Sequence, residues 1–263
     1  MGKYFVFFKN SISESLIYRT SVFLVFFSQL ISTAVFIFLW SAIYREGGQI
    51  GSYTLEGLVQ YFVLVGFLNF TILGVDVSWR VSEDIRLGNV TNYILKPISY
   101  YKTMLFVTLG KSCFNFVLIV LVIVPLAFFG GYLNDFSFGM TRALAVAFSL
   151  AIAFLLFMTF SFIVGLFAFW VGDGRGFNYG MKLVMSFFSG SIIPLNLLPD
   201  YMMSVNDFLP FKSIAWVPIS LMTGKIEPEW QIYLPGMIWI MILFLAVKFI
   251  YNQALKQYEG LGA

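Results

Sequence analysis

Residues 21–44 read SVFLVFFSQLISTAVFIFLWSAIY and contain no charged side chain. A helix of about 20 predominantly apolar residues crosses the hydrocarbon core of a bilayer, so this stretch predicts a transmembrane helix. The composition of the chain agrees with this prediction, because 60% of its 263 residues are hydrophobic and only 11% are charged. A soluble domain carries about 45–50% apolar and about 25% charged residues. The sequence therefore predicts an integral membrane protein.

Five further apolar stretches extend the prediction to six transmembrane helices. They cover residues 57–75, 104–132, 143–171, a stretch that begins near Lys182, and residues 231–251. The stretch after Lys182 is the least regular, because Gly190, Pro194 and Pro199 interrupt it. We expect an all-α integral membrane protein that forms a single domain over residues 1–263 and has a broken fifth helix.

The residues before the first span carry apolar side chains at spacings of three or four. The apolar side consists of Phe5, Phe8, Ile12 and Leu16, and the polar side of Lys9, Asn10, Ser13 and Glu14. This pattern predicts an amphipathic helix that lies in the membrane interface. A frayed polar tail with scattered aromatic residues is the alternative.

Lysine and arginine residues are distributed unequally between alternate loops. With the N-terminus inside, twelve of the 16 lie on the cytoplasmic side, and the other four are Arg45, Arg142, Lys212 and Lys225. Loops rich in these residues stay in the cytoplasm, so both termini are expected to be cytoplasmic. The same scatter accounts for the net charge of +3 without a nucleic-acid partner. No cleavage site for a signal peptidase precedes or follows the first span, which we expect to be retained.

Several kinds of chemistry lack the residues that they need. The chain has no His, which excludes imidazole catalysis and His-ligated metals. Its one cysteine, Cys113, cannot by itself form an internal disulfide or a thiolate metal site. Residues 174–182 are rich in glycine, but Met181 interrupts the Gly-Lys-Ser/Thr ending of a P-loop. We therefore expect no catalytic residue, no metal and no cofactor in this chain.

The loop after the second span contains a candidate docking helix. Ser82 is expected to cap it, with two acidic residues in its first turn, and Gly88 is expected to end it in the left-handed conformation. Pro97 prevents any continuation of the helix. The expected element projects below the membrane and suits docking on a cytoplasmic partner; an ordinary interfacial connector is the alternative. Its residues are Ser82, Glu83, Asp84, Ile85, Arg86, Leu87 and Gly88.

A second candidate site is the break after Lys182. Irregular backbone at membrane depth is tolerated only where it is buried in protein or lines a water-filled cavity. We therefore expect a re-entrant hairpin near the outer leaflet, marked by Gly190, Pro194, Asn196 and Pro199. A plain kinked helix followed by a surface loop is the alternative.

These motifs, in this order, resemble the permease subunit of an ABC-2 type exporter. The resemblance covers essentially the whole chain and rests on the strings EDIRLG (83–88), ILKPISY (94–100), SG (189–190), IP (193–194), LP (198–199) and KQYEGLG (256–262). It implies a permease of the bacterial cytoplasmic membrane that exports a substrate. It also implies two copies of a separate ATP-binding subunit, which bind ATP and Mg, and a second, related permease in a heterodimer.

The resemblance assigns a role to the first candidate site. Residues 82–88 become the coupling helix that contacts the ATP-binding subunit, whose closure shifts the paired permeases as rigid bodies. We expect the break to form an outer gate at the interface with the second permease, because the carbonyls near Gly190 and Leu195 lack regular helical donors. Single cysteines at positions 189, 191 and 196 should therefore be more reactive than one at Phe244. A secondary carrier or channel without an ATPase is the alternative function. An intramembrane enzyme is disfavoured, because no acidic pair or metal-ligand cluster lies within a span.

Overall fold

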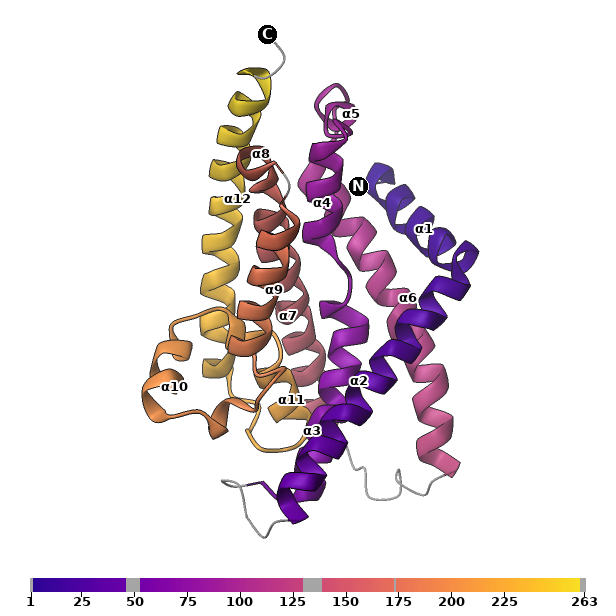
Figure 1. The fold of residues 1–263 in the computed structure, drawn as a ribbon, viewed down its shortest axis with the longest axis vertical. Coiled ribbons are helices and arrows are strands. Elements are labelled where there is room, and N and C mark those ends of the chain that lie inside the picture. Colours follow the sequence, from indigo (N-terminus) through magenta and orange to yellow (C-terminus); the bar gives the residue numbers. More distant parts are fainter. Residues whose placement is uncertain (1, 46–52, 130–138, 173, 261–263) are drawn as a thin grey trace.

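The computed structural model describes residues 2–45, 53–129, 139–172 and 174–260, and every regular element in these ranges is helical (Figure 1). Five helical segments there are long and apolar enough to cross a membrane: Arg19–Tyr44, Leu55–Arg86, Tyr100–Val122, Met140–Val171 and Trp230–Lys256. Four of the predicted spans lie within or closely match these segments. The stretch 104–132 overlaps a fifth, and its last residues, 130–132, lie outside the described part of the chain.

The predicted count of six spans is not confirmed within the described ranges. The expected fifth span corresponds to α9 (Arg175–Phe188), which has 14 residues and is too short to cross a bilayer. Its end at Ser189 is followed by short helical pieces rather than by a continuation of the helix. These pieces are η2 (Leu195–Leu197), α10 (Asp200–Asp207), η3 (Phe211–Ser213), α11 (Trp216–Met222) and η4 (Trp230–Tyr233).

The long segments follow the chain in order. The first is α2 (Arg19–Arg45), and the second combines α3 (Leu55–Leu68), the π-helical turn η1 (Asn69–Leu73) and α4 (Val77–Arg86). The short α5 (Thr91–Ile94) leads into α6 (Tyr100–Phe129). The remaining long helices are α7 (Met140–Leu166), which continues into α8 (Ala168–Val171), and α12 (Leu234–Gly260). Figure 1 places α4, α5 and the end of α12 at one end of the molecule, and α10 and α11 toward the other.

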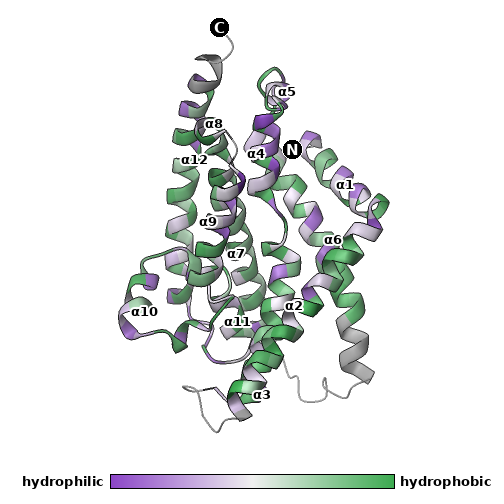
Figure 2. Ribbon diagram, viewed as in Figure 1, coloured by the Kyte–Doolittle hydropathy of each residue, from purple (hydrophilic) through white to green (hydrophobic). Residues whose placement is uncertain are grey.

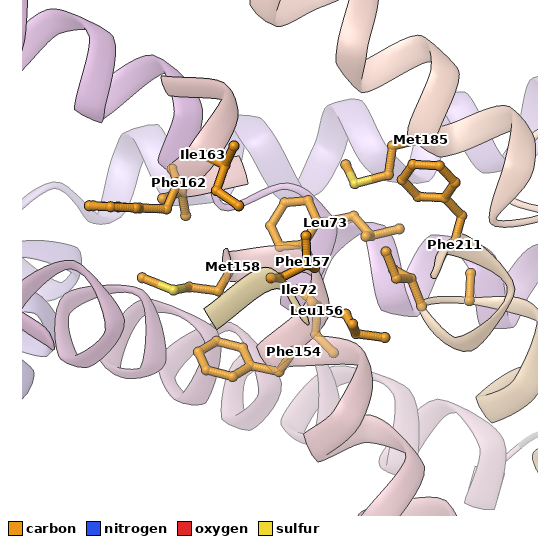
Figure 3. Close-up of a cluster of buried hydrophobic side chains, with 14 of the residues drawn as sticks. Ile72, Leu73, Phe154, Leu156, Phe157, Met158, Phe162, Ile163, Met185 and Phe211 are labelled. Carbon is orange, nitrogen blue, oxygen red and sulfur yellow. The ribbon is translucent and has the colours of Figure 1, made fainter. Parts of the chain in front are cut away.

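The centre of the bundle is α7. In the most apolar stretch of the segment Met140–Val171, which contains α7, 72% is buried within the chain. In the corresponding stretch of Arg19–Tyr44, which contains α2, only 6% is buried. Figure 3 shows Phe157 and Leu156 of α7 surrounded by side chains from η1, α9 and the segment that contains Phe211. In a bilayer, close packing of this kind holds helices together, because burial from water contributes little. Many of the apolar residues of α2 that Figure 2 colours green are exposed on the surface of the chain.

The N-terminal segment forms α1 (Gly2–Ile17), and it contacts the bundle through its small residues. Ser11 and Ser15 are its buried residues, and they lie against α6, where Gly110 leaves no room for a Cβ atom next to Ser11 and the carbonyl of Phe8. Phe5 is about half exposed. The placement of α1 in a membrane interface remains a prediction.

Candidate functional site

The predicted docking segment is the last turn of a longer helix. α4 begins at Val77, and the Asp76 carboxylate caps it by accepting a hydrogen bond from the backbone N–H of Trp79 at 3.4 Å. Ser82 is therefore not the cap: it is buried, and its hydroxyl donates to the carbonyl oxygen of Gly165 at 3.2 Å. The prediction of a separate helix starting at Ser82, with Glu83 and Asp84 in its first turn, is wrong. An acidic capping residue precedes it, and an apolar face runs through the whole of α4.

The end of α4 agrees with the prediction. Gly88 has a φ of 73°, and its backbone N–H donates to the carbonyl of Ile85, so it occupies the left-handed position that ends a helix. The chain then turns through α5 toward Pro97. We call residues 86–97 the α4–α5 tip. Leu87, Ile94 and Leu95 expose 58%, 44% and 79% of their surface there.

Polar groups at the base of the tip are paired. Arg86 forms an ion pair with Glu83 one turn away. The hydroxyl of Tyr100 donates to the Asp84 carboxylate at 3.0 Å. Burial, together with the negative charge of Asp84, raises the pKa of Tyr93 above its ordinary value. The tip therefore presents apolar side chains on a base whose charges are held in place.

A buried polar joint holds α4 against α7 and α9. The side-chain amide of Asn178 donates to the Ser82 hydroxyl at 2.9 Å and to the Ser78 carbonyl at 3.4 Å. Its side-chain oxygen is buried and has no hydrogen-bond partner among the described residues. At Gly165 of α7, the Val81 side chain and the Ser78 carbonyl of α4 occupy the space that a Cβ atom would need. Sequence reasoning missed this joint; the available signal was one asparagine within the glycine-rich residues 174–182.

We call residues 189–199 the outer turn; it is the break that the sequence predicted. Gly190 has a φ of 87°, and its carbonyl accepts a hydrogen bond from the Tyr61 hydroxyl at 2.8 Å. The carbonyl of Ser189 accepts from the backbone N–H of Trp216, and that of Leu195 from the N–H of Leu198, both at 3.0 Å. The carbonyl groups near Gly190 and Leu195 thus find their partners within this chain, as a break buried in protein requires.

The side chains of the outer turn differ in accessibility. Ser189 and Ser191 are buried, with their hydroxyl oxygens 2.9 Å apart, and this burial argues against the predicted reactivity of cysteines at these two positions. The outer turn lies against Trp216, and the local sequence gives no sign of this contact. Asn196 is exposed and accepts hydrogen bonds from Tyr53 and Trp216 at 3.0 and 3.2 Å. Pro194 is buried, whereas Pro199 is exposed where α10 begins.

A lysine completes the surroundings of the outer turn. The Lys225 ammonium lies 2.9 Å from the centre of the Tyr53 ring. Burial lowers the pKa of Lys225, and burial also raises the pKa of Tyr53, against the opposing effect of its hydrogen bond to Asn196. The hydrogen bonds from Tyr61 of α3 and from the backbone of Trp216 at the start of α11 hold the turn between these two helices. No group of three or more His, Cys, Asp and Glu that could hold a metal ion occurs in the described ranges.

Five long apolar helices, a helix break held by its own chain and an exposed tip at one end define a multi-pass membrane protein. A family model described as "ABC-2 family transporter protein" matches residues 30–262, and the chain belongs to this family. Proteins of this family are membrane components of transporters. Membership of the family implies association with ABC ATP-binding subunits. No curated protein and no solved structure matched the chain.

Proposed function

We propose that this chain is the permease subunit of an ATP-driven exporter in the bacterial cytoplasmic membrane. Both termini and the α4–α5 tip lie in the cytoplasm in this proposal, as the loop charges favour. The chain itself is not catalytic. Two copies of an ATP-binding subunit hold ATP and Mg and supply the hydrolysis.

The observation that carries the proposal is the construction of the α4–α5 tip. Three apolar side chains are exposed there, while Val81, Ser82 and Ile85 fix the helix beneath them against α7. A docking surface that transmits force needs both features, because a loosely attached tip would bend instead of moving the spans. Residues 82–88 therefore act as the base and edge of the contact with the ATPase.

The outer turn and α9 are proposed to face the second permease. Tyr179, Leu183 and Val184 are exposed apolar side chains on α9, and α9 leads directly into the outer turn. A related permease packed on this face would cover them and would place Gly190, Pro194, Asn196 and Pro199 near the axis of the pair. In that position, rearrangement of the outer turn would open or close an export path.

The test is to co-express the chain with an ATP-binding subunit and to measure co-purification and substrate-dependent ATPase activity. Leu95→Asp should abolish most of the association, because it places a charge in an apolar contact. Phe208→Asp is the matched control, since Phe208 is exposed to the same extent, 80% against 79%, but lies beyond α10. Unchanged co-purification of Leu95→Asp would contradict the assignment of the tip. Transport by the chain without any ATPase would instead support a secondary carrier or channel.

A further inference from the structure

A cavity of about 540 Å³ lies between α1, α2, η1, α4 and α6, apart from the outer turn. Ligand pockets in proteins have volumes of about 300–1,000 Å³, so the cavity can hold a small molecule. It follows α6 from Met104 to Asn115, and at 1.5 Å per residue this wall is about 16 Å long. The α2 wall consists of Ser21, Val22 and Val25, and the rest of the chain buries little of this helix.

The α6 wall has a polar stripe inside this apolar surrounding. Thr108, Lys111 and Asn115 are spaced by three and four residues, so they lie on the same face of the helix. Thr108 is only 3% exposed and has no hydrogen-bond partner among the described residues. Asn115 uses its side-chain N–H to donate to the Phe70 carbonyl at 2.8 Å, and its own oxygen remains as an acceptor. The wall therefore offers two oxygen atoms, at different depths, that can accept hydrogen bonds.

Charged side chains also line the cavity. Four are carboxylates and two are cations: Glu14, Asp76, Glu83, Asp84, Arg80 and Lys111. Two of the carboxylates pair with cations outside the lining, Glu83 with Arg86 and Asp76 with Lys182. The two cations share Glu14, at 3.3 Å from Lys111 and 3.9 Å from Arg80. Asp84 accepts the hydrogen bond from Tyr100 but forms no ion pair with any described residue. One carboxylate of the lining is therefore available to a cationic ligand.

We propose that this cavity binds an amphiphile with an ammonium head and an apolar body. The head lies at the α4 wall, where Asp84 supplies the opposite charge and the ring of Trp79 can accept a cation on its face. The body extends along α2 and α6, with Thr108 and Asn115 available to its polar atoms. An anionic amphiphile would be repelled by Asp84, and an uncharged one would leave Asp84 with its hydrogen bond from Tyr100 but without an ion pair.

Two sources can supply such a molecule: the aminoethyl headgroup of a phospholipid, and a dissolved lipophilic amine. The test uses the full-length chain in nanodiscs of phosphatidylglycerol, which carries no ammonium group. The probe is an alkylamine with a benzophenone on its chain, and the corresponding alcohol is its control. Cross-linked peptides are mapped by mass spectrometry.

The amine should label peptides of α2 and α6 about fivefold more than the alcohol, as expected for one partly exposed charged contact. Phosphatidylethanolamine added to the nanodiscs should compete if the ligand is a lipid, and a short lipophilic amine should compete if it is dissolved. Asp84→Asn and Thr108→Val should each lower the labelling by the amine. Asp200→Asn, which changes an exposed acid on α10, should leave it unchanged.

A second variant fills the cavity without removing any polar contact. Val25 is exposed on α2 and lines the cavity, so Val25→Trp should block labelling while the protein remains folded and monodisperse. Equal labelling by amine and alcohol, or full labelling of Val25→Trp, would overturn the proposal. The measurement needs no ATPase, and its outcome is therefore independent of whether the α4–α5 tip docks one.

Discussion

The close contact between α4 and α7 at Gly165 predicts that a larger residue at this position destabilises the packing of the two helices. A methyl group at Gly165 would lie 2.6 Å from Cβ of Val81 and 2.8 Å from the carbonyl oxygen of Ser78. Both atoms belong to or adjoin the backbone of α4, so neither can rotate away. Carbon atoms pack best at about 3.5–4.0 Å. In Gly165→Ala, α4 must therefore move away from α7 by about 1 Å.

The magnitude follows from two contributions. Overpacking of this kind costs about 1–3 kcal/mol. The shift also stretches the hydrogen bond from Ser82 to the Gly165 carbonyl, now 3.2 Å, and a hydrogen bond contributes about 0.5–1.5 kcal/mol. We expect Gly165→Ala to lower the thermal midpoint of the detergent-purified protein by several degrees, at about 2–4 °C per kcal/mol.

The matched control is Gly176→Ala on α9. A Cβ atom there meets nothing within 4 Å, so the thermal midpoint should not fall. Adding Val81→Ala to Gly165→Ala removes Cγ1 of Val81, which the new methyl group would also meet at 2.8 Å, and leaves the overlap with Cβ of Val81 and the Ser78 carbonyl. Because part of the overlap is relieved, the double variant should be more stable than the two single effects would predict. Equal midpoints for Gly165→Ala and Gly176→Ala would refute the close contact on which this reasoning rests.

Three more predictions concern other parts of the chain. Asn178→Ala should destabilise the protein by about 1–3 kcal/mol, read as a lower thermal midpoint, because its buried hydrogen bonds are lost. Gly190→Ala should cost about 1–2 kcal/mol for its positive φ, and its new Cβ would also lie 2.9 Å from the Tyr61 hydroxyl; an unchanged midpoint would speak against this turn. Tyr201→Cys, in a Cys113→Ala background, should react with an impermeant thiol reagent from outside intact cells. Reaction only after lysis would mean that the proposed orientation is inverted.

Hydropathy predicted the long helices well, because a run of about 20 apolar residues depends only on local composition. It also located the break after Lys182, since prolines cannot continue a helix. It could not show that α9 is too short to span a bilayer. It also could not show that the outer turn lies against Trp216, whose backbone N–H donates to the Ser189 carbonyl. Those features depend on Tyr61 and Trp216, whose partners in the outer turn are far away in the sequence.

The start of α4 shows the opposite kind of limit. Ser82 and Asp76 are both good capping residues, and the local rule does not choose between them. The choice is made by tertiary packing, because Val77, Val81 and Ile85 form one buried face that begins directly after Asp76. Ser82 then serves as a buried donor to α7. At the N-terminus the periodicity predicted an amphipathic helix with an apolar side, whereas the buried residues of α1 are Ser11 and Ser15, and the contact of Ser11 depends on the glycine that faces it on α6.

The position of α9 connects the two candidate sites. Near its start, Asn178 is hydrogen-bonded to Ser82 of α4, and just beyond its end the Gly190 carbonyl is hydrogen-bonded to Tyr61 of α3. α3 and α4 belong to the same membrane segment, and between them lie the π-helical turn and the non-helical residues 74–76. α9 therefore bridges the one irregular part of that segment. If the proposed ATPase moves the α4–α5 tip, the irregular part must absorb the movement or α9 must pass it to the outer turn. Because a rigid helix held at both ends cannot follow α4 and α3 independently, bending at residues 74–76 and rearrangement at Gly190 are expected to occur together.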